Sequence, residues 1–252
     1  MRELEGKIAI VTGGIRGIGR GITEELMKEG ASVLAAYYEE EEEAVPALEE
    51  LQQRAQACQV HVKGLHVDIS KVAEIGRMFD FCETELGKID IFIANAGANI
   101  PRKPIFEHTE EDFDRVCGVN FKGTYFCVKE CGLRMNDNGR IVLISSSSVP
   151  YPVDGHSVYS PTKAAVEMLA HDAALEYGAR GITVNSVAPG VTLTHMAKDV
   201  LSEEFIESVK DGTPLKKVGL PHDVAQAVVL LCLPRAEWIN GQRITANGGS
   251  HF

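Results

Sequence analysis

The chain has 252 residues, a length that is ordinary for one undivided α/β domain, and its 44% hydrophobic content is enough to fill a core. A formal net charge of −11 with no visible basic stripe argues against nucleic acid and anionic membrane surfaces as partners. No apolar run approaches the roughly 20 residues that span a bilayer, and the first five residues contain no signal core, so we expect a cytoplasmic protein.

Six short apolar segments alternate with longer segments of helical pattern. They are residues 8–11, 33–36, 65–67, 91–94, 141–144 and 183–187. Strands that are apolar almost throughout are buried on both faces, which is typical of a parallel sheet with helices on each side. Because the crossovers between parallel strands are right-handed, the pattern predicts an α/β, doubly wound parallel sheet in a single domain, residues 1–252.

A glycine-rich turn, Thr-Gly-Gly-Ile-Arg-Gly-Ile-Gly, follows the first strand at residues 12–19. Gly13 permits the tight turn, Gly17 lets the chain approach a pyrophosphate, and Gly19 lets the next helix pack closely. The N-terminus of that helix adds partial positive charge. Taken alone, the turn is equally compatible with an ordinary glycine turn or with the nucleotide loop of a methyltransferase.

Two later segments carry helix signals. The run Thr109-Glu110-Glu111-Asp112 has the pattern of a capping box and predicts the start of the helix that leads to Asn120. Further along, Tyr159 and Lys163 are four residues apart, so on a helix they share one face. The ammonium of Lys163 then lies beneath the phenol and favours its ionised form. A tyrosine with an ordinary pKa of ~10 becomes a usable proton shuttle for a carbonyl or alcohol in this way.

Six features stand in the order and spacing of the short-chain dehydrogenase/reductase family. They are the glycine turn, Asn95-Ala96-Gly97, Asn120, the serine cluster around Ser146, Tyr159-x-x-x-Lys163, and Pro189-Gly190. The chain resembles this family from Gly6 to Gly249. The resemblance implies a Rossmann-type fold with a seventh strand at 243–246 and a substrate flap at 191–213. Family members pack the helices near Asn120 and Tyr159 against a second subunit, which implies a homotetramer or a homodimer.

The resemblance also implies a nicotinamide dinucleotide cofactor. Asp68 and Ile69 are expected to cap its adenine, Asn95 to support the sheet and the cofactor edge, and residues 189–194 to hold the nicotinamide carboxamide. A second interpretation makes Asp68 the cap of the helix after Ser70, and the two roles are compatible. The full set of expected cofactor contacts is Gly13, Ile15, Arg16, Gly17, Ile18, Gly19, Tyr37, Asp68, Ile69, Asn95, Ala96, Gly97, Tyr159, Lys163, Pro189, Gly190, Thr192 and Thr194.

Four residues are expected to carry catalysis by the same resemblance. Tyr159 would donate the proton and Ser146 would hydrogen-bond the carbonyl oxygen. Lys163 would also grip the nicotinamide ribose, and Asn120 would hold, through its carbonyl, a water that links Lys163 to solvent. The choice of Ser146 among neighbouring serines rests on its position thirteen residues before Tyr159. Pro161 departs from the small residue usual in the family, and a proline fits only near the start of a helix.

The choice between NAD(H) and NADP(H) depends on the side chains that surround the 2′ position of the adenosine ribose. An NAD enzyme of this fold usually carries Asp or Glu about 20 residues beyond the glycine turn, and Tyr37 stands there instead. Arg16 can pair with a 2′-phosphate through its guanidinium, so the sequence favours NADP(H), with NAD(H) as the alternative. The acidic run Glu39 to Glu43 opposes this choice if Glu39 points inward, because its carboxylate would repel the phosphate.

These features predict an oxidoreductase that transfers a hydride between the cofactor and a ketone or secondary alcohol. Its substrate is a small molecule that the sequence does not identify. We expect the substrate site to be lined by residues 99–103, 147–156 and 191–213, with Tyr151 and His156 as candidate contacts. The rival hypothesis is a catalytically silent sensor or scaffold of the same fold, whose mark would be the loss of Tyr159 or Lys163. Six cysteines and eight histidines lack disulfide or metal spacing, so we expect buried reduced thiols and no metal site.

Overall fold

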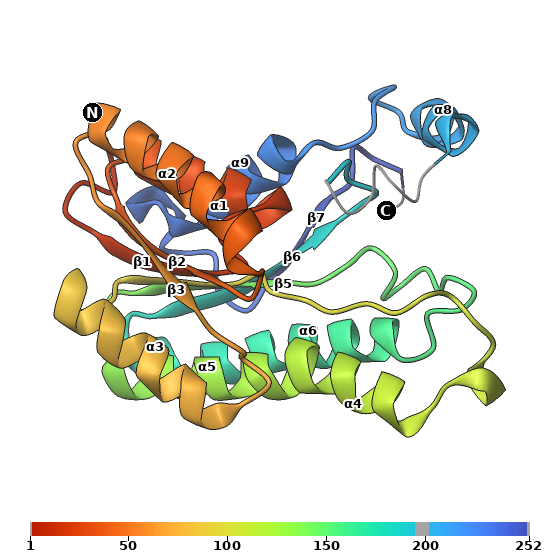
Figure 1. Ribbon diagram of the computed structural model, residues 1–252, viewed down its shortest axis with the longest axis horizontal. Helices are drawn as coiled ribbons and strands as arrows, with labels where there is room; N and C mark the ends of the chain where they lie inside the picture. The colour runs from red at the N-terminus through yellow and green to blue at the C-terminus, as the bar shows by residue number, and fades with distance from the viewer. Residues whose placement is uncertain (1, 195–201, 251–252) are drawn as a thin grey trace.

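The computed structural model describes residues 2–194 and 202–250, which form three layers with a sheet in the middle (Figure 1). The seven strands are β1 (Ile8–Thr12), β2 (Ser32–Tyr37), β3 (Val62–His66), β4 (Ile91–Ala94), β5 (Arg140–Ile144), β6 (Thr183–Pro189) and β7 (Arg243–Ala246). They are all parallel and lie in the order β3-β2-β1-β4-β5-β6-β7. This confirms the predicted single-domain, doubly wound, seven-stranded sheet.

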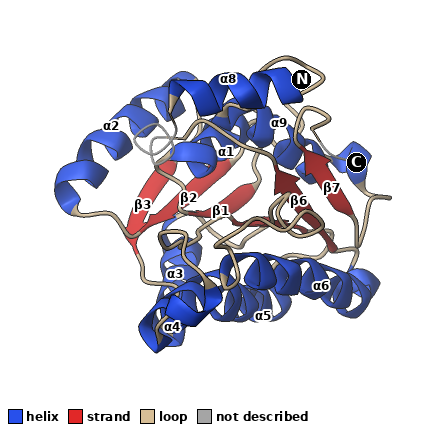
Figure 2. Cartoon of the chain, turned by 90° about the vertical axis from the view of Figure 1, so that its right-hand side faces the viewer, coloured by secondary structure: helices blue, strands red, loops and turns tan. Residues whose placement is uncertain are grey.

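Helices cover both faces of the sheet. One layer contains α1 (Gly17–Lys28), α2 (Glu41–Ala57) and α9 (Pro221–Cys232), with α8 (Glu203–Gly212) beyond it. The opposite layer contains α3 (Val72–Glu85), α4 (Glu110–Cys117), α5 (Thr124–Arg134) and α6 (Tyr159–Tyr177). Figure 2 shows the same two layers above and below the strands.

Alternate residues of each inner strand fill two separate cores. In β1, Ala9 and Val11 join the core under α1, α2 and α9, whereas Ile10 joins the core on the α3, α5 and α6 side. In the second core Phe92 of β4 stacks on Phe79 of α3, with 5.9 Å between ring centroids. Burial on both faces is why these strands are apolar throughout.

The edge strand β3 differs from its predicted position. We expected residues 65–67, but the strand runs from Val62 to His66 and pairs with β2 along Val33–Tyr37. At an edge, the strand is only partly covered, so Lys63 and Gly64 can occupy it. The rule that looks for continuous apolar runs applies to inner strands and therefore misses the start of this one.

The chain direction across the sheet reverses at β1, which lies between β2 and β4. Ligands of open α/β sheets bind beyond the carboxyl ends of the strands at such a switch point. The glycine turn at residues 13–19 follows β1, and Asn95 follows β4, so both lie at this crevice.

The predicted capping box is confirmed. Thr109 precedes α4, its hydroxyl accepts a hydrogen bond from the Asp112 amide at 3.2 Å, and the Asp112 carboxylate accepts one from the Thr109 amide at 3.0 Å. The helix then continues through a π-helical turn, η2 (Gly118–Gly123), directly into α5. Single π-helical turns inside helices occur frequently at functional sites.

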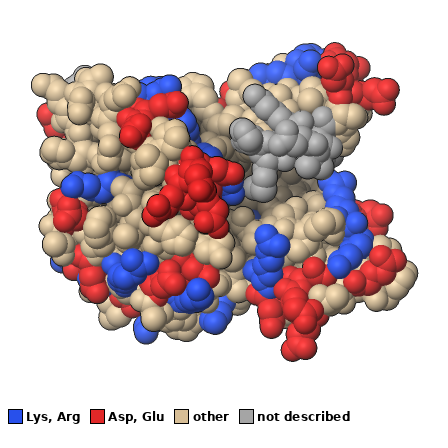
Figure 3. Space-filling view, in the orientation of Figure 1, with Lys and Arg blue, Asp and Glu red and all other residues tan. Residues whose placement is uncertain are grey.

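The surface carries charges of both signs, and the cysteines are unpaired. On the face in Figure 3, acidic and basic side chains lie interspersed, with an acidic cluster near the centre. No described helix is both long and apolar enough to cross a membrane. All six cysteines are free, and Cys58 and Cys117 are half-buried rather than buried as expected.

Candidate active site

The glycine turn requires glycine at three positions. Gly13 and Gly17 have φ angles of 65° and 53°, in the left-handed region that side chains disfavour. Gly19 is in close contact with the turn itself, because a Cβ there would lie 1.9 Å from the Gly13 carbonyl oxygen and 2.5 Å from Asn95 Nδ2. The turn therefore folds back on the start of α1 in a way that only glycine permits.

Asn95 ties the end of β4 to this turn. Its Nδ2 donates to the carbonyl oxygens of Thr12 at 2.9 Å and Gly13 at 3.2 Å. The Thr12 hydroxyl accepts from the amides of Asn95 and Ala96, both at 3.0 Å. Sequence reasoning missed Thr12, although a buried threonine at the end of an apolar strand is a signal for such a bridge.

The N-terminus of α1 faces the segment after β6. Arg16 is the N-cap residue, and no side chain caps the helix. The first amides of such a helix lack partners within the helix and favour an anion. A Cβ on Gly17 would lie 3.5 Å from the Thr194 side chain, so the expected contacts near residues 17 and 194 come together at the same place.

The side chain of Glu39 points inward. It is 7% exposed and forms an ion pair with Arg16, with 2.5 Å between Oε1 and Nε. Glu43 lies 3.7 Å from Nη1 of the same arginine. Tyr37, at the end of β2, packs edge-on against His66 at 5.7 Å between ring centroids. Among the described residues, Arg16 therefore has two carboxylates beside its single guanidinium.

Asp68 does not cap the next helix. Its Oδ1 accepts hydrogen bonds from the Ser70 amide at 3.0 Å and the Ser70 hydroxyl at 2.6 Å. The N-cap residue of α3 is Lys71, which has no side-chain cap. Asp68 instead closes the turn that precedes the helix, so the capping interpretation is wrong. The next residue, Ile69, is buried against η2, where a Cβ on Gly123 would lie 2.6 Å from its carbonyl oxygen.

Tyr159, Lys163 and Ser146 come together above the end of β5. Tyr159 is the first residue of α6, and the Ser146 hydroxyl lies near enough to its phenol to act on the pKa of that phenol. Lys163 Nζ lies 5.8 Å from the Tyr159 ring centroid and donates to the Ile144 carbonyl oxygen at 2.8 Å. Pro161 is the third residue of the helix, where its missing amide breaks no intrahelical hydrogen bond.

The acidity of the pair differs from expectation. Burial raises the pKa of Tyr159, and the Ser146 hydrogen bond acts in the opposite direction. Burial lowers the pKa of Lys163 to about 8. The expected lowering of the tyrosine pKa by the ammonium is not seen: burial and Ser146 are the causes of the Tyr159 shift, and Lys163 donates instead to the Ile144 carbonyl oxygen.

Asn120 lies in the π-helical turn and is buried. Its Oδ1 accepts from the Ala98 amide at 2.7 Å, and its Nδ2 donates to the Ala98 carbonyl oxygen at 3.0 Å and to Thr162 Oγ1 at 3.2 Å. A Cβ on Gly97 would lie 3.5 Å from Asn120 Oδ1 and 3.6 Å from Lys163 Nζ. Asn120 therefore connects the loop after β4 to the helix of Lys163, and its side-chain oxygen already has a partner.

Comparison with known proteins agrees with this geometry. Residues 13–251 match the family described as enoyl-(acyl carrier protein) reductase. A short-chain dehydrogenase/reductase of Pestalotiopsis microspora, GME11373, is 37% identical over 260 residues, which cover 98% of this chain and 96% of that protein. The chain belongs to the short-chain dehydrogenase/reductase family. It is therefore a member of an oxidoreductase family whose enzymes use nicotinamide cofactors.

Two solved structures are similar to this chain along nearly its whole length. A blue fluorescent protein from a metagenomic library, in complex with NADPH, aligns with a TM-score of 0.91 at 28% identity and covers 99% of this chain and 100% of its own. The promiscuous reductase LugOII, which catalyses keto-reduction at C1 during lugdunomycin biosynthesis, aligns with a TM-score of 0.89 at 31% identity, covering 98% and 99%.

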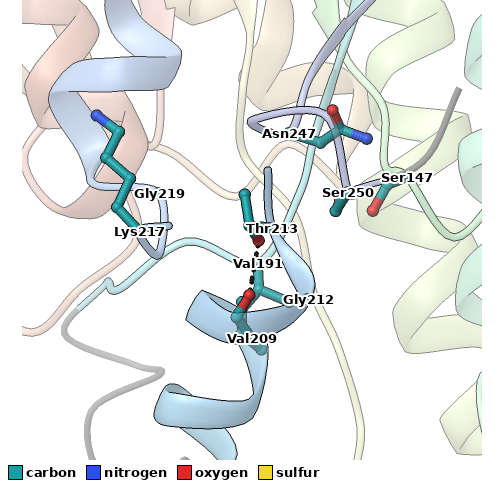
Figure 4. A pocket seen from close by; sticks show the side chains of 9 residues that line it. All are labelled: Ser147, Val191, Val209, Gly212, Thr213, Lys217, Gly219, Asn247 and Ser250. Carbon is teal, nitrogen blue, oxygen red and sulfur yellow. Dashed lines mark hydrogen bonds between the residues drawn. The ribbon is translucent and has the colours of Figure 1, made fainter. Parts of the chain in front are cut away.

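A cavity of about 190 Å³ lies next to the serine cluster after β5, where Ser147 lines it (Figure 4). It is lined by Ser147, Val191, Val209, Gly212, Thr213, Lys217, Gly219, Asn247 and Ser250. Figure 4 shows Asn247, Ser250 and Ser147 gathered on one side, and Lys217 extends away from them. Two of the three predicted segments contribute, whereas residues 99–103 do not line this cavity. Residues 195–201 of the expected flap lie outside the described residues.

Several contributions to this cavity and to the candidate site escaped sequence reasoning, among them Lys217 and Gly219, which follow the predicted flap. Asn247 and Ser250 follow β7, the last strand, and only the fold brings the chain terminus to the cavity. Thr162 accepts the Asn120 hydrogen bond and donates to the Tyr159 carbonyl oxygen at 2.7 Å. Its position next to Lys163 on the catalytic helix was the available signal.

Proposed function

We propose that this enzyme interconverts a ketone and a secondary alcohol with a nicotinamide cofactor, and that Tyr159 is its general acid and base. The observation that carries the proposal is that three groups meet at Tyr159: the Ser146 hydroxyl acts on the phenol, and the Lys163 ammonium lies 5.8 Å from the centroid of the same ring. Tyr159 holds the proton that reaches the carbonyl oxygen, and Ser146 donates a hydrogen bond to that oxygen as negative charge develops. The nicotinamide, when bound, supplies the hydride.

The residues at the switch point fit the cofactor. The uncapped N-terminus of α1 and the close approach allowed at Gly17 suit a pyrophosphate. Asn95 braces the turn that holds it, and Thr194 borders the same space. Lys163 would bind the nicotinamide ribose hydroxyls, for which it would leave the Ile144 carbonyl. We assign the proposed water relay to the main-chain carbonyl of Asn120, because the side-chain oxygen is engaged with Ala98.

We propose that the Arg16–Glu39 pair determines the choice between the two cofactors. Arg16 supports a preference for NADP(H), and the known NADPH complex of a related structure supports it as well. The inward carboxylate of Glu39 opposes that preference, because it neutralises the arginine and would repel a 2′-phosphate. NADP(H) is therefore expected to be used with only a small advantage over NAD(H).

A further proposal concerns assembly. Large apolar side chains are exposed on the outer surface of α5 and α6, among them Leu133 at 70%, Met168 at 58% and Leu175 at 84%. A second exposed set lies on and after α9, where Leu230 is 52% and Trp238 is 96% exposed. Two separate apolar faces suit a homotetramer, since each closed interface of a tetramer needs its own surface.

The test of the proposed reaction is oxidation of NADPH or NADH on a panel of cyclic, acyl-thioester and polyol-derived ketones. The wild type should turn over at least one of them. Tyr159→Phe should bind cofactor with unchanged affinity, measured by fluorescence titration, while kcat falls by roughly 10² to 10⁴.

Exposed Tyr38 offers a matched control, and Tyr38→Phe should retain kcat. Turnover of Tyr159→Phe near the wild-type rate would remove the general-acid role. Cofactor binding without turnover on every ketone would favour the rival hypothesis of a silent sensor or scaffold.

A further inference from the structure

Three serines form a chain of hydroxyl groups that ends at Tyr159. Ser160 Oγ lies 3.0 Å from Ser148 Oγ, and Ser148 Oγ lies 3.0 Å from Ser146 Oγ. Ser146 is in turn the hydroxyl that acts on the phenol of Tyr159. Ser148 is 5% exposed, so water competes little for its hydroxyl.

The backbone fixes one end of this chain. The Ser148 amide donates to Ser146 Oγ at 3.1 Å, and an amide can only donate. A serine oxygen has two acceptor positions and one proton. The Ser148 amide takes one acceptor position, and the Ser148 hydroxyl takes the other. The proton of Ser146 is then left for the phenol oxygen of Tyr159 or for a substrate oxygen beside it.

The direction of the chain depends on which way the Ser160 hydroxyl donates. When Ser160 donates to Ser148, Ser148 directs its own proton to Ser146, and each hydrogen bond polarises the next. The reverse direction would turn the Ser146 proton toward Ser148 and leave the phenol without this donor. The geometry therefore links the orientation of the Ser146 proton to Ser148, which is bonded to Ser146, and to Ser160, which is bonded only to Ser148 in this chain of hydroxyl groups.

We propose that Ser148 is a positioning residue, assisted by Ser160, which holds the Ser146 hydroxyl with its proton directed at Tyr159 and at the substrate oxygen. The inference rests on the proposed function for its effect on turnover. Ser146 enters the reaction already oriented, so no reorientation is needed as charge develops on the substrate oxygen.

The kinetic test compares Ser148→Ala with the wild type on a ketone that the enzyme reduces. We expect kcat to fall about tenfold with the KM for the cofactor unchanged, and Ser148→Thr to restore most of it because its hydroxyl can take the same place. Ser146→Ala/Ser148→Ala should be no slower than Ser146→Ala alone. The matched control is Ser157→Ala, an exposed serine of the same loop, which should retain the wild-type kcat. Additive losses in the double variant would overturn the proposal.

A second measurement does not need turnover. The pH titration of the Tyr159 phenol can be followed by NMR in protein labelled with ¹³C at tyrosine Cζ, with Tyr159→Phe to identify the resonance. Two other titratable groups face this phenol: Lys163 beneath its ring, and His156 with its ring centroid 5.3 Å away. Both are present in every variant compared, so they do not bias the comparison.

The expected result is a higher Tyr159 midpoint in Ser148→Ala, since the Ser146 hydrogen bond lowers the pKa of the phenol. Ser157→Ala should leave the midpoint unchanged. An unchanged midpoint in Ser148→Ala overturns the positioning role, whatever the kinetics show. A wild type that reduces no ketone overturns the proposed function instead, and the Tyr159 midpoint still decides the role of Ser148.

Discussion

Lys163 places an amine in the interior of the protein, only 4% exposed, where burial lowers its pKa to about 8. An unfolded chain would hold the same proton up to a pKa of 10.5. At neutral pH the folded protein thus holds the buried Lys163 ammonium, whose charge burial disfavours, at the place where the proposed reaction needs a cation. Unfavourable placement of this kind is typical of functional residues.

The buried amine predicts a pH dependence of stability. Below pH 8 both states carry the proton, and the cost of the buried charge is constant. Between about pH 8 and 10.5 the unfolded state binds more protons than the folded state, so the free energy of unfolding should rise with pH. Lys163→Met should be more stable than the wild type at pH 7, and urea unfolding should show this advantage shrinking as the pH rises toward 10.

A constant difference between the two proteins across that range would mean that Lys163 keeps its ordinary pKa in the folded state. Lys28→Met, at an exposed lysine of α1, is the matched control and should show no such trend.

Arg16 and Glu39 supply a second prediction at this scale. Glu39→Gln keeps the size of the side chain, removes its charge and releases the Arg16 guanidinium to bind a 2′-phosphate. The kcat/KM with NADPH, divided by the kcat/KM with NADH, should therefore rise tenfold or more. Arg16→Ala should lower the ratio. Glu43→Gln is the matched control, because its oxygen lies 3.7 Å from Arg16 and is largely exposed, and it should have a smaller effect. A tenfold advantage for NADH in the wild type would mean that Glu39, not Arg16, sets the preference.

At the scale of elements, the segments around the candidate active site differ in how firmly they are packed. The π-helical turn η2 is held by buried Asn120, which joins it to Ala98 and Thr162. The helix α8, by contrast, contains no buried residue. Its N-terminus is capped by the Ser202 hydroxyl, which accepts a hydrogen bond from the Phe205 amide at 3.2 Å. Few buried contacts mean that local opening costs little.

This contrast predicts how α8 responds to ligand. If residues 191–213 close over the substrate, amide hydrogen exchange in α8 should slow when cofactor and a ketone analogue bind, while exchange in α5 should stay the same. Hydrogen exchange with mass spectrometry of the peptides covering both helices checks this. Equal rates in α8 with and without ligands would contradict a closing flap.

At the scale of the whole molecule, the exposed apolar faces predict the oligomeric state. Met168→Glu/Leu175→Glu on α6 should reduce the molar mass measured by light scattering at least twofold, because charge is placed in the proposed interface. Trp238→Glu should halve the mass of a tetramer. Val45→Glu on α2, at a site 48% exposed, is the control and should leave the mass unchanged. A wild type that runs as a monomer would exclude both interfaces.

Local patterns in the sequence were sufficient for the parts of this protein that depend on near neighbours. Apolar runs predicted the inner strands because those strands are buried on both faces, and the Thr109 capping box needed only four residues. Tyr159 and Lys163 share a helix, so their four-residue spacing predicted that they lie together. The family resemblance depended on motifs of the same local kind.

Other features required the tertiary structure, because they depend on where distant side chains point. The inward turn of Glu39 toward Arg16 joins residues from two different elements, and nothing in the acidic run distinguishes it from a solvated helix start. Asn247 reaches the cavity only because β7 ends beside β6. The pKa of Lys163 likewise follows from burial, which the sum of long-range packing determines.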